Sequence, residues 1–80
     1  MASKRVGAAG VLEEHVQLGV VLRVRDRRII SLRAGDRIVI DGTSYELQED
    51  ENGWLYFELA GVLAKVRQPL RQLIGRRVEL

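Results

Sequence analysis

The sequence predicts an all-β domain, a small SH3-like or OB-like barrel of five to seven short antiparallel strands with one short helical turn near residues 69–74. Short segments alternate between apolar and polar residues, which is typical of half-buried strands. Turn-forming Gly, Asp and Asn residues separate these segments. With 80 residues and no cysteine, the chain has room for one core and no disulfide framework. Barrel closure would also cover the strand edges.

The first predicted strand spans His15–Arg25, where every even-numbered residue from Val16 to Val24 is apolar. Asp26–Arg28 interrupts the pattern, and Ile29–Arg33 can return antiparallel. A loop made of those three residues would place Leu22 opposite Leu32, so that both strands turn their apolar side chains to one side.

Two further predicted strands surround an Asp-Gly turn. Ala34–Asp36 turns the chain into the strand Arg37–Ile40. Asp41–Ser44 then turns it into Tyr45–Gln48, and Asp-Gly between apolar runs is a strong hairpin signal.

The register of the next hairpin follows from its apolar residues. A two-residue turn at Asn52–Gly53 would set Leu47 opposite Glu58 and leave the apolar side chains on different faces. A three-residue loop, Glu51–Gly53, with the glycine at positive φ, instead pairs Leu47 with Phe57. We therefore predict the three-residue loop.

This register turns Trp54 and Tyr56 away from the core, among acidic and amide side chains at 46, 48 and 50. Outward aromatic residues often mark contacts, so both are predicted protein-interface residues. Base stacking is an alternative, although the acidic neighbours would repel phosphates. In the other alternative, a folded-over arm or a terminal strand covers the two rings.

The C-terminal quarter predicts a strand, a helical turn and a last strand. Alternation indicates a short strand over residues 62–66, and Pro69 permits a helical start. Gly75 can end the turn in the left-handed conformation, before a strand at residues 76–80. The turn has one apolar face, formed by Leu70, Leu73 and Ile74.

The chain divides into a flexible N-terminal arm, residues 1–14, and a single barrel domain, residues 15–80. Val6–Gly10 consists of residues too small and flexible to pack a core alone. The first ten residues lack the apolar stretch of a signal peptide, and no apolar run approaches the roughly 20 residues of a membrane span. We therefore expect an intracellular or virion location, no secretion by signal peptide and no membrane partner.

The sequence predicts no enzyme, no cofactor and no metal site. His15 is the one histidine, and neither it nor its neighbours Glu13 and Glu14 suggest a catalytic set or a complete metal shell. The acidic run Glu49–Glu51 could bind a hard cation or a basic partner, but it lacks the spacing of a calcium loop and is more typical of a solvated hairpin tip.

Charge is unevenly distributed along the chain. Residues 46–60 contain five acidic and no basic side chains, and 11 of the 13 cations are arginines. Arginine binds carboxylates and phosphates in planar, two-point contacts, so the count does not choose between protein and nucleic acid. The candidate phosphate or carboxylate contacts are Arg23, Arg25, Arg27, Arg28, Arg76 and Arg77.

Residues 32–59 resemble a segment of the small β-barrel virion proteins of tailed phages that join head to tail or decorate the capsid. An apolar residue precedes Gly35-Asp36, alternating aliphatic residues follow, and an acidic tip leads into Trp54–Leu59. The resemblance implies an assembly part without catalytic residues, which joins its neighbours through arms and loops.

Residues 32–40 also resemble the ending of swapped-hairpin DNA-binding domains of antitoxins and transition-state regulators. The arginine-rich strand before them fits that family, whereas its upstream Ile-Pro element is missing. The sequence therefore predicts a non-enzymatic assembly module with a protein partner, as a homo-oligomer or within a larger assembly. The alternative is a nucleic-acid-binding barrel, such as a transcriptional regulator or antitoxin.

Overall fold

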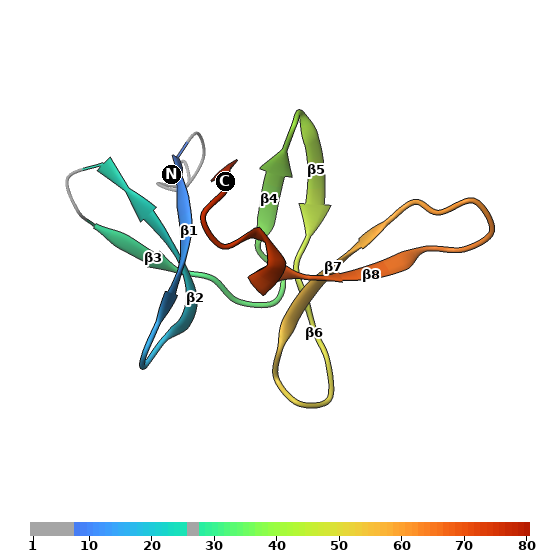
Figure 1. Cartoon of the computed structure of the whole chain (residues 1–80), viewed down its shortest axis with the longest axis horizontal. Coiled ribbons are helices and arrows are strands. Elements are labelled where there is room, and N and C mark those ends of the chain that lie inside the picture. Colours follow the sequence, from blue (N-terminus) through green and yellow to red (C-terminus); the bar gives the residue numbers. More distant parts are fainter. Residues whose placement is uncertain (1–7, 26–27) are drawn as a thin grey trace.

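The computed structural model describes residues 8–25 and 28–80, and these ranges are all-β apart from one 3-10 helix (Figure 1). Every strand pairing in them is antiparallel. The elements are β1 (Ala9–His15), β2 (Gly19–Val24), β3 (Ile29–Ser31), β4 (Arg37–Ile40), β5 (Thr43–Glu46), β6 (Gln48–Glu49), β7 (Leu55–Leu59), β8 (Val66–Pro69), the 3-10 helix η2 (Leu70–Leu73) and β9 (Arg77–Glu79).

The strands form two open sheets, so the predicted closed barrel is wrong. One sheet has the order β3-β2-β1-β9-β4-β5 and the other β6-β7-β8. The chain changes sheet at Leu47, whose N–H donates to the Asp36 carbonyl at 2.8 Å and whose carbonyl accepts the Gly35 N–H at 2.9 Å. These bonds satisfy the backbone at the point where β5 would otherwise continue a single ladder. Leu47 separates β5 from β6, which is one reason why the described ranges contain nine strands and not the five to seven that the sequence predicted.

The predicted N-terminal arm is wrong for residues 9–14, which belong to β1. This strand lies between β2 and β9 in the six-stranded sheet, and Leu12 is fully buried. Gly10 is buried as well, and a β-carbon there would lie 2.1 Å from the Arg23 carbonyl oxygen. The small residue therefore allows a close backbone approach. Residues 1–7 of the predicted arm lie outside the described residues.

The predicted strand His15–Arg25 is wrong at its start, because residues 16–18 form a turn and β2 begins at Gly19. Nδ1 of His15 accepts the backbone N–H groups of Gln17 and Leu18, at 3.1 and 3.2 Å. Gly19 has a φ of 81°, in the left-handed region. The β2–β3 register differs by two residues from the prediction, with Leu22 opposite Ile30, which keeps the apolar side chains on the predicted side.

The β6–β7 hairpin confirms the predicted register and loop. Gln48 pairs with Tyr56, which is the register that sets Leu47 against Phe57. Gly53 ends the three-residue loop with a φ of 83°. At the β4–β5 hairpin the turn is shorter than predicted: residues 41 and 42 form it, both with positive φ, and Thr43 and Ser44 belong to β5.

The C-terminal quarter confirms the helical turn and the last strand. η2 follows Pro69, Gly75 has a φ of 92°, and β9 completes the six-stranded sheet. Ile74 lies outside η2 and is 36% exposed. The predicted strand over residues 62–66 is wrong, because residues 60–65 form a loop and β8 begins at Val66.

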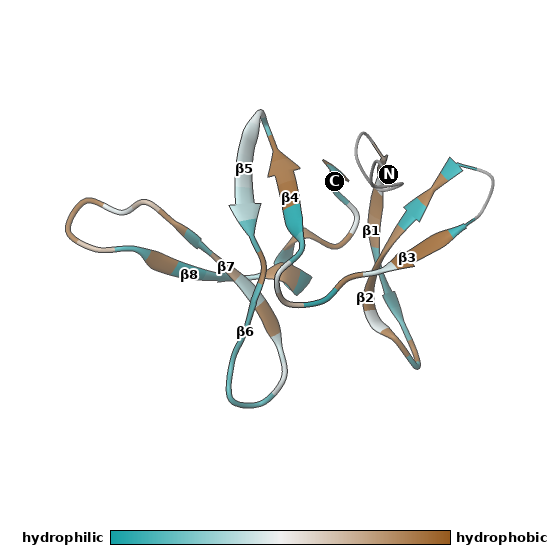
Figure 2. Cartoon of the chain, turned by 180° about the vertical axis from the view of Figure 1, so that it is seen from behind, coloured by the Kyte–Doolittle hydropathy of each residue, from teal (hydrophilic) through white to brown (hydrophobic). Residues whose placement is uncertain are grey.

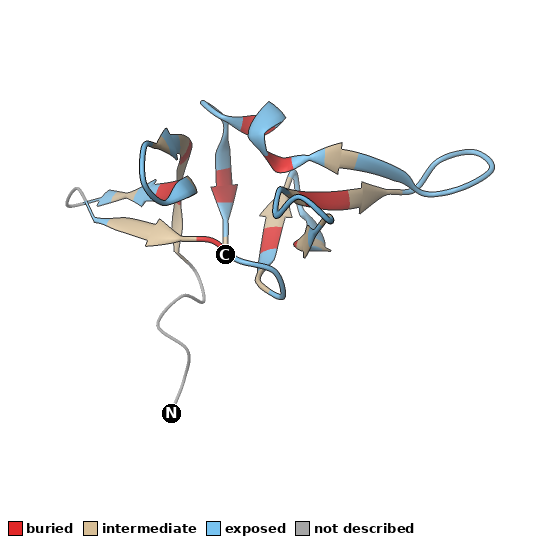
Figure 3. Ribbon diagram, turned by 90° about the horizontal axis from the view of Figure 1, so that it is seen from below, coloured by how far each residue is buried: buried red, intermediate tan, exposed pale blue. Residues whose placement is uncertain are grey.

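The core lies where the strands of the two sheets face one another, together with η2 (Figure 3). The Tyr45 ring lies 5.0 Å from that of Phe57, which joins β5 of one sheet to β7 of the other. No helix in the described ranges is long and apolar enough to span a membrane. The buried cluster consists of Leu12, Leu22, Leu32, Ile38, Leu47, Phe57, Leu70, Leu73 and Val78.

Candidate functional site

The loop between β6 and β7 fixes the backbone that carries Trp54. Oδ1 of Asp50 accepts the N–H of Asn52 at 2.8 Å and that of Trp54 at 2.9 Å. The backbone closes the same loop, since the Asp50 N–H donates to the Trp54 carbonyl and the Gly53 N–H donates to the Asp50 carbonyl, both at 3.0 Å. This is the side-chain-to-backbone bonding that Asp typically makes in turns. The backbone that carries the indole is therefore fixed by four hydrogen bonds.

The Trp54 side chain is 52% exposed, as the sequence predicted for an outward aromatic residue. The Arg71 guanidinium lies over one face of the indole, with its central carbon 4.6 Å from the ring centroid. The same guanidinium forms a 3.1 Å ion pair with Glu14 of β1. The chain of contacts from Glu14 through Arg71 to Trp54 thus links the six-stranded sheet to the β6–β7 loop.

Tyr56 is buried, with 9% of its surface exposed, so its predicted outward position is wrong. It does lie on the face that the register assigns, because its hydroxyl donates to Oε1 of Gln48 at 3.3 Å. β8 pairs with β7 along its edge, and its side chains shield the ring: Pro69 lies opposite Tyr56, and the Arg67 guanidinium lies 4.5 Å from the ring centroid. The alternative in which an arm or a terminal strand covers both rings is wrong, because β8 is not the terminal strand and Trp54 remains half exposed.

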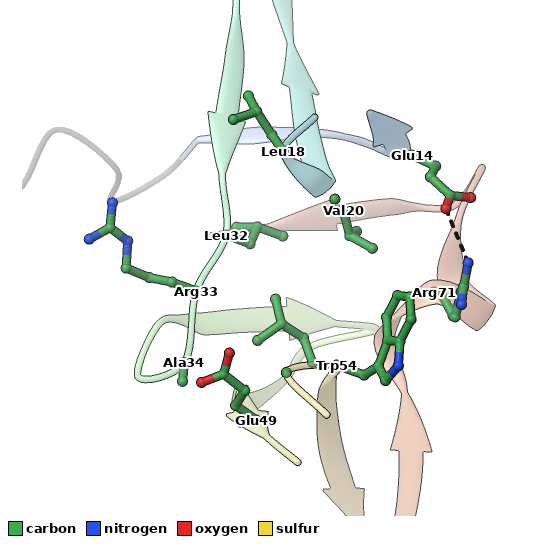
Figure 4. A pocket seen from close by; sticks show the side chains of 12 residues that line it. Glu14, Leu18, Val20, Leu32, Arg33, Ala34, Glu49, Trp54 and Arg71 are labelled. Atoms are coloured by element: carbon green, nitrogen blue, oxygen red, sulfur yellow. Dashed lines mark hydrogen bonds and ion pairs between the residues drawn. The ribbon is translucent and has the colours of Figure 1, made fainter. Parts of the chain in front are cut away.

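A pocket of about 460 Å³ opens beside Trp54, between β2 and the segment after β3 on one side and the β6–β7 hairpin on the other (Figure 4). Val20 and Leu32 lie across the hollow from Trp54 and Glu49. A second hollow, of about 320 Å³, shares the indole and continues past Asp50 to Arg67. Trp54 therefore stands between two depressions. The apolar part of the larger pocket is formed by Leu18, Val20, Leu32, Trp54 and Leu55.

Charged side chains occupy the edge of the larger pocket. Glu14 and Arg71 pair with each other, and Arg33 lies at the opposite end (Figure 4). Glu49 lines the pocket and makes no ion pair within the described residues. The site therefore offers apolar walls, one half-exposed indole and, at its edge, the Glu49 carboxylate and the Arg33 guanidinium, neither of which makes an ion pair within the described residues.

The predicted arginine contacts do not gather at this pocket. Arg23 pairs with Glu13 at 2.8 Å and Arg76 lies 3.8 Å from Asp41, so both contact carboxylates of their own chain. Arg27 lies outside the described residues. The other three are exposed and lie on or beside different strands: Arg25, Arg28 and Arg77.

Arg23 and Arg77 nevertheless share one face of the six-stranded sheet. Val11 pairs with Arg23 on one side and with Arg77 on the other, so the two arginines lie in one row across three strands. The pairing of Arg23 with Glu13 reduces the positive charge of this face.

His15, and Asp50 of the acidic run Glu49–Glu51, accept hydrogen bonds from the backbone of their own turns. The imidazole of His15 holds the β1–β2 turn through its Nδ1 atom. Asp50 is used by the hydrogen bonds of its own loop. In residues 8–25 and 28–80 there is no group of three or more His, Asp or Glu side chains placed to hold a metal ion.

Sequence reasoning missed both arginines that lie on the aromatic rings. Arg67 faces Tyr56 because β8 begins at Val66, and a correct β7–β8 register would have revealed it. Arg71 reaches Trp54 from η2, which no pairing pattern in the sequence indicates. The apolar walls from Leu18 and Val20 were missed because both were assigned to one continuous strand.

Comparison with known proteins gives no match: no family model, no curated protein and no solved structure matches this chain.

Proposed function

We propose that this chain is a non-enzymatic assembly module, which docks on protein through Trp54 and the adjoining pocket. The observation that carries the proposal is a half-exposed indole fixed between two hollows. Tryptophan is strongly enriched among the residues that dominate binding energy at protein interfaces, especially beside pockets that exclude water. The resemblance of residues 32–59 to phage virion proteins suggests head-tail joining or capsid decoration as the specific form of this role.

Charge around the indole favours a protein over a nucleic acid. Glu49, Asp50 and Glu51 lie in or next to the Trp54 loop, and Glu49 lines the pocket. Such carboxylates repel phosphates but can pair with Lys or Arg of a protein. The cations near the indole are partly engaged, since Arg71 pairs with Glu14 and Arg67 covers Tyr56.

The test is self-association of the wild-type chain and of Trp54→Ala, measured by analytical ultracentrifugation from about 1 μM to 1 mM, the range of ordinary weak to moderate interfaces. Removal of a central interface tryptophan costs about 2 kcal/mol or more, so we expect at least a thirtyfold higher Kd for the variant. Trp54→Phe keeps an aromatic ring and should retain part of the affinity. Circular dichroism checks that both variants fold. Unchanged association of a folded Trp54→Ala protein would refute the proposed docking face.

The nucleic-acid alternative has one supporting observation, the row of Arg23 and Arg77 across β2, β1 and β9. It predicts binding of labelled DNA or RNA that weakens steeply with salt, measurable by fluorescence anisotropy. The double variant Arg23→Gln and Arg77→Gln should then reduce the salt dependence. Absence of binding at low salt would exclude this alternative.

A further inference from the structure

The β7–β8 hairpin carries an apolar tip that projects from the body of the molecule (Figure 1). Its last ladder pair is Leu59 with Val66, and the loop of residues 60–65 extends beyond it. Val62 is 100% exposed and Leu63 is 97% exposed. Figure 2 shows hydrophobic colouring at this outer end. Single exposed apolar residues are common on protein surfaces, but two adjacent aliphatic side chains at the end of a projecting hairpin favour contact with another molecule.

The backbone of the tip makes a tight turn. A β-carbon on Gly61 would lie 2.2 Å from the carbonyl oxygen of Ala64, so glycine is needed where these two backbone segments approach. The turn leaves the two residues between them, Val62 and Leu63, facing solvent. The shape of the loop thus presents the apolar pair outward.

The apolar pocket beside Trp54 lies elsewhere on the molecule. Its walls come from β2, the segment after β3 and the β6–β7 hairpin, whereas the tip extends in another direction (Figures 1 and 4). No residue of the loop 60–65 lines that pocket. One copy of the chain therefore presents both an apolar projection and an apolar hollow that the projection does not fill.

One charge on each surface is complementary to the other, if Lys65 meets the Glu49 end of the pocket and not the Arg33 end. Lys65 lies next to the apolar tip, and Glu49 lies at the pocket edge. Within the described residues neither side chain makes an ion pair. Insertion of the tip of one copy into the pocket of another would bring an unpaired cation to an unpaired carboxylate.

We propose that the Val62–Leu63 tip of one copy inserts into the Trp54 pocket of a second copy; this inference rests on the proposed function and names the partner. The pocket volume of about 460 Å³ lies within the roughly 300–1,000 Å³ of pockets that enclose small ligands. The contact is heterologous, since the two copies use different surfaces. Repetition of a heterologous contact generates a ring when the rotation closes and a filament when it does not.

The test combines two variants that each remove one half of the contact. Leu63→Asp places a charge on the tip, and Leu18→Asp places a charge on the pocket wall at a residue that is 48% exposed. Neither residue belongs to the buried core. We expect each variant alone to lose at least tenfold in self-association relative to wild type, by analytical ultracentrifugation. Ile74→Ser, at an exposed apolar residue outside both surfaces, is the matched control and should associate as wild type does.

An equimolar mixture of the two variants gives the decisive result. The Leu63→Asp chain keeps an intact pocket and the Leu18→Asp chain keeps an intact tip, so the mixture should form a heterodimer with one chain of each and nothing larger. A contact between identical surfaces would not be restored by mixing. A mixture that stays monomeric, or a Leu63→Asp chain that assembles as wild type does, would overturn the inference.

The charge pair gives an independent readout. Lys65→Glu should weaken association at least threefold, and Glu49→Lys in the partner chain should restore it in the mixture. Failure of the inference is distinguishable from failure of the proposed function. If Trp54→Ala weakens association and the tip variants do not, the docking face stands and its occupant is another segment. If the tip variants weaken association and Trp54→Ala does not, the tip docks at a different surface and both conclusions fail.

Discussion

Replacement of Gly10 by alanine should destabilise the fold strongly, because β1 has no space for a β-carbon at this position. The added carbon would lie 2.1 Å from the carbonyl oxygen of Arg23 and 2.8 Å from its carbonyl carbon. Both are backbone atoms, so no side-chain rotation relieves the contact. β1 must instead move away from β2, which opens pairs such as Leu12 with Leu22, both fully buried.

The size of the stability loss follows from the kind of rearrangement that Gly10→Ala forces. Overpacking that forces side-chain and backbone shifts costs about 1–3 kcal/mol, occasionally more, and here no side chain can relieve the contact, so we expect about 3 kcal/mol. In a domain of this size each kcal/mol shifts Tm by about 4–8 °C, which predicts a decrease of about 12–24 °C. Thermal unfolding followed by circular dichroism measures it.

The matched control is Ala9→Gly, the reverse exchange at the neighbouring position of the same strand. It adds backbone freedom without a clash and should cost only about 0.5–1 kcal/mol. If Gly10→Ala costs no more than Ala9→Gly, the close approach of β1 and β2 is not what holds this strand in the sheet. A free arm over residues 8–14 would give that result.

Two further predictions concern the Trp54 loop. Asp50→Ala should lower the free energy of unfolding in urea by about 1–3 kcal/mol, because two backbone N–H groups lose their acceptor at about 0.5–1.5 kcal/mol each. Asp50→Asn keeps the acceptor oxygen and should cost less. Equal losses for the two variants would mean that the charge matters and the acceptor does not. Arg71→Gln should change the free energy of unfolding by less than about 1 kcal/mol, since the ion pair of Arg71 with Glu14 is exposed. It should nevertheless shift the fluorescence emission of Trp54, the one tryptophan of the chain, because the guanidinium no longer lies over the indole. An unchanged spectrum would contradict the stacked geometry.

The apolar pattern was sufficient to choose between the two candidate loops of the β6–β7 hairpin, because the three-residue loop puts Leu47 and Phe57 on the same face and the two-residue turn does not. Side-chain parity also predicted the face of Trp54 and Tyr56 correctly. It could not predict exposure, because exposure depends on the side chains that the neighbouring strand places on that face. Arg67 of β8 lies over Tyr56, whereas Trp54 precedes the β7–β8 ladder and stays half exposed.

The prediction for the N-terminal half failed for two local reasons. The even-numbered apolar positions continue through residues 16–18, so alternation alone could not locate the β1–β2 turn; the imidazole of His15 and the positive φ of Gly19 form it instead. Small residues before Val11 suggested an arm, whereas at Gly10 the lack of a side chain is what permits close strand pairing. Composition alone does not distinguish a flexible glycine from one required by packing.

The most consequential error, the closed barrel, is also the one that bears on function. A barrel would have joined the outer strands and filled the space between them with side chains. Here the chain passes from one sheet to the other at Leu47, and the two sheets remain separate ladders. The Trp54 pocket lies along this division, with walls from β2 on one side and from the β6–β7 hairpin on the other. A domain of this size buries only about 60% of the surface that its unfolded chain exposes, so unfilled apolar walls leave it little margin. An occupant that fills the pocket would therefore stabilise the fold as it binds, and assembly and folding would be coupled.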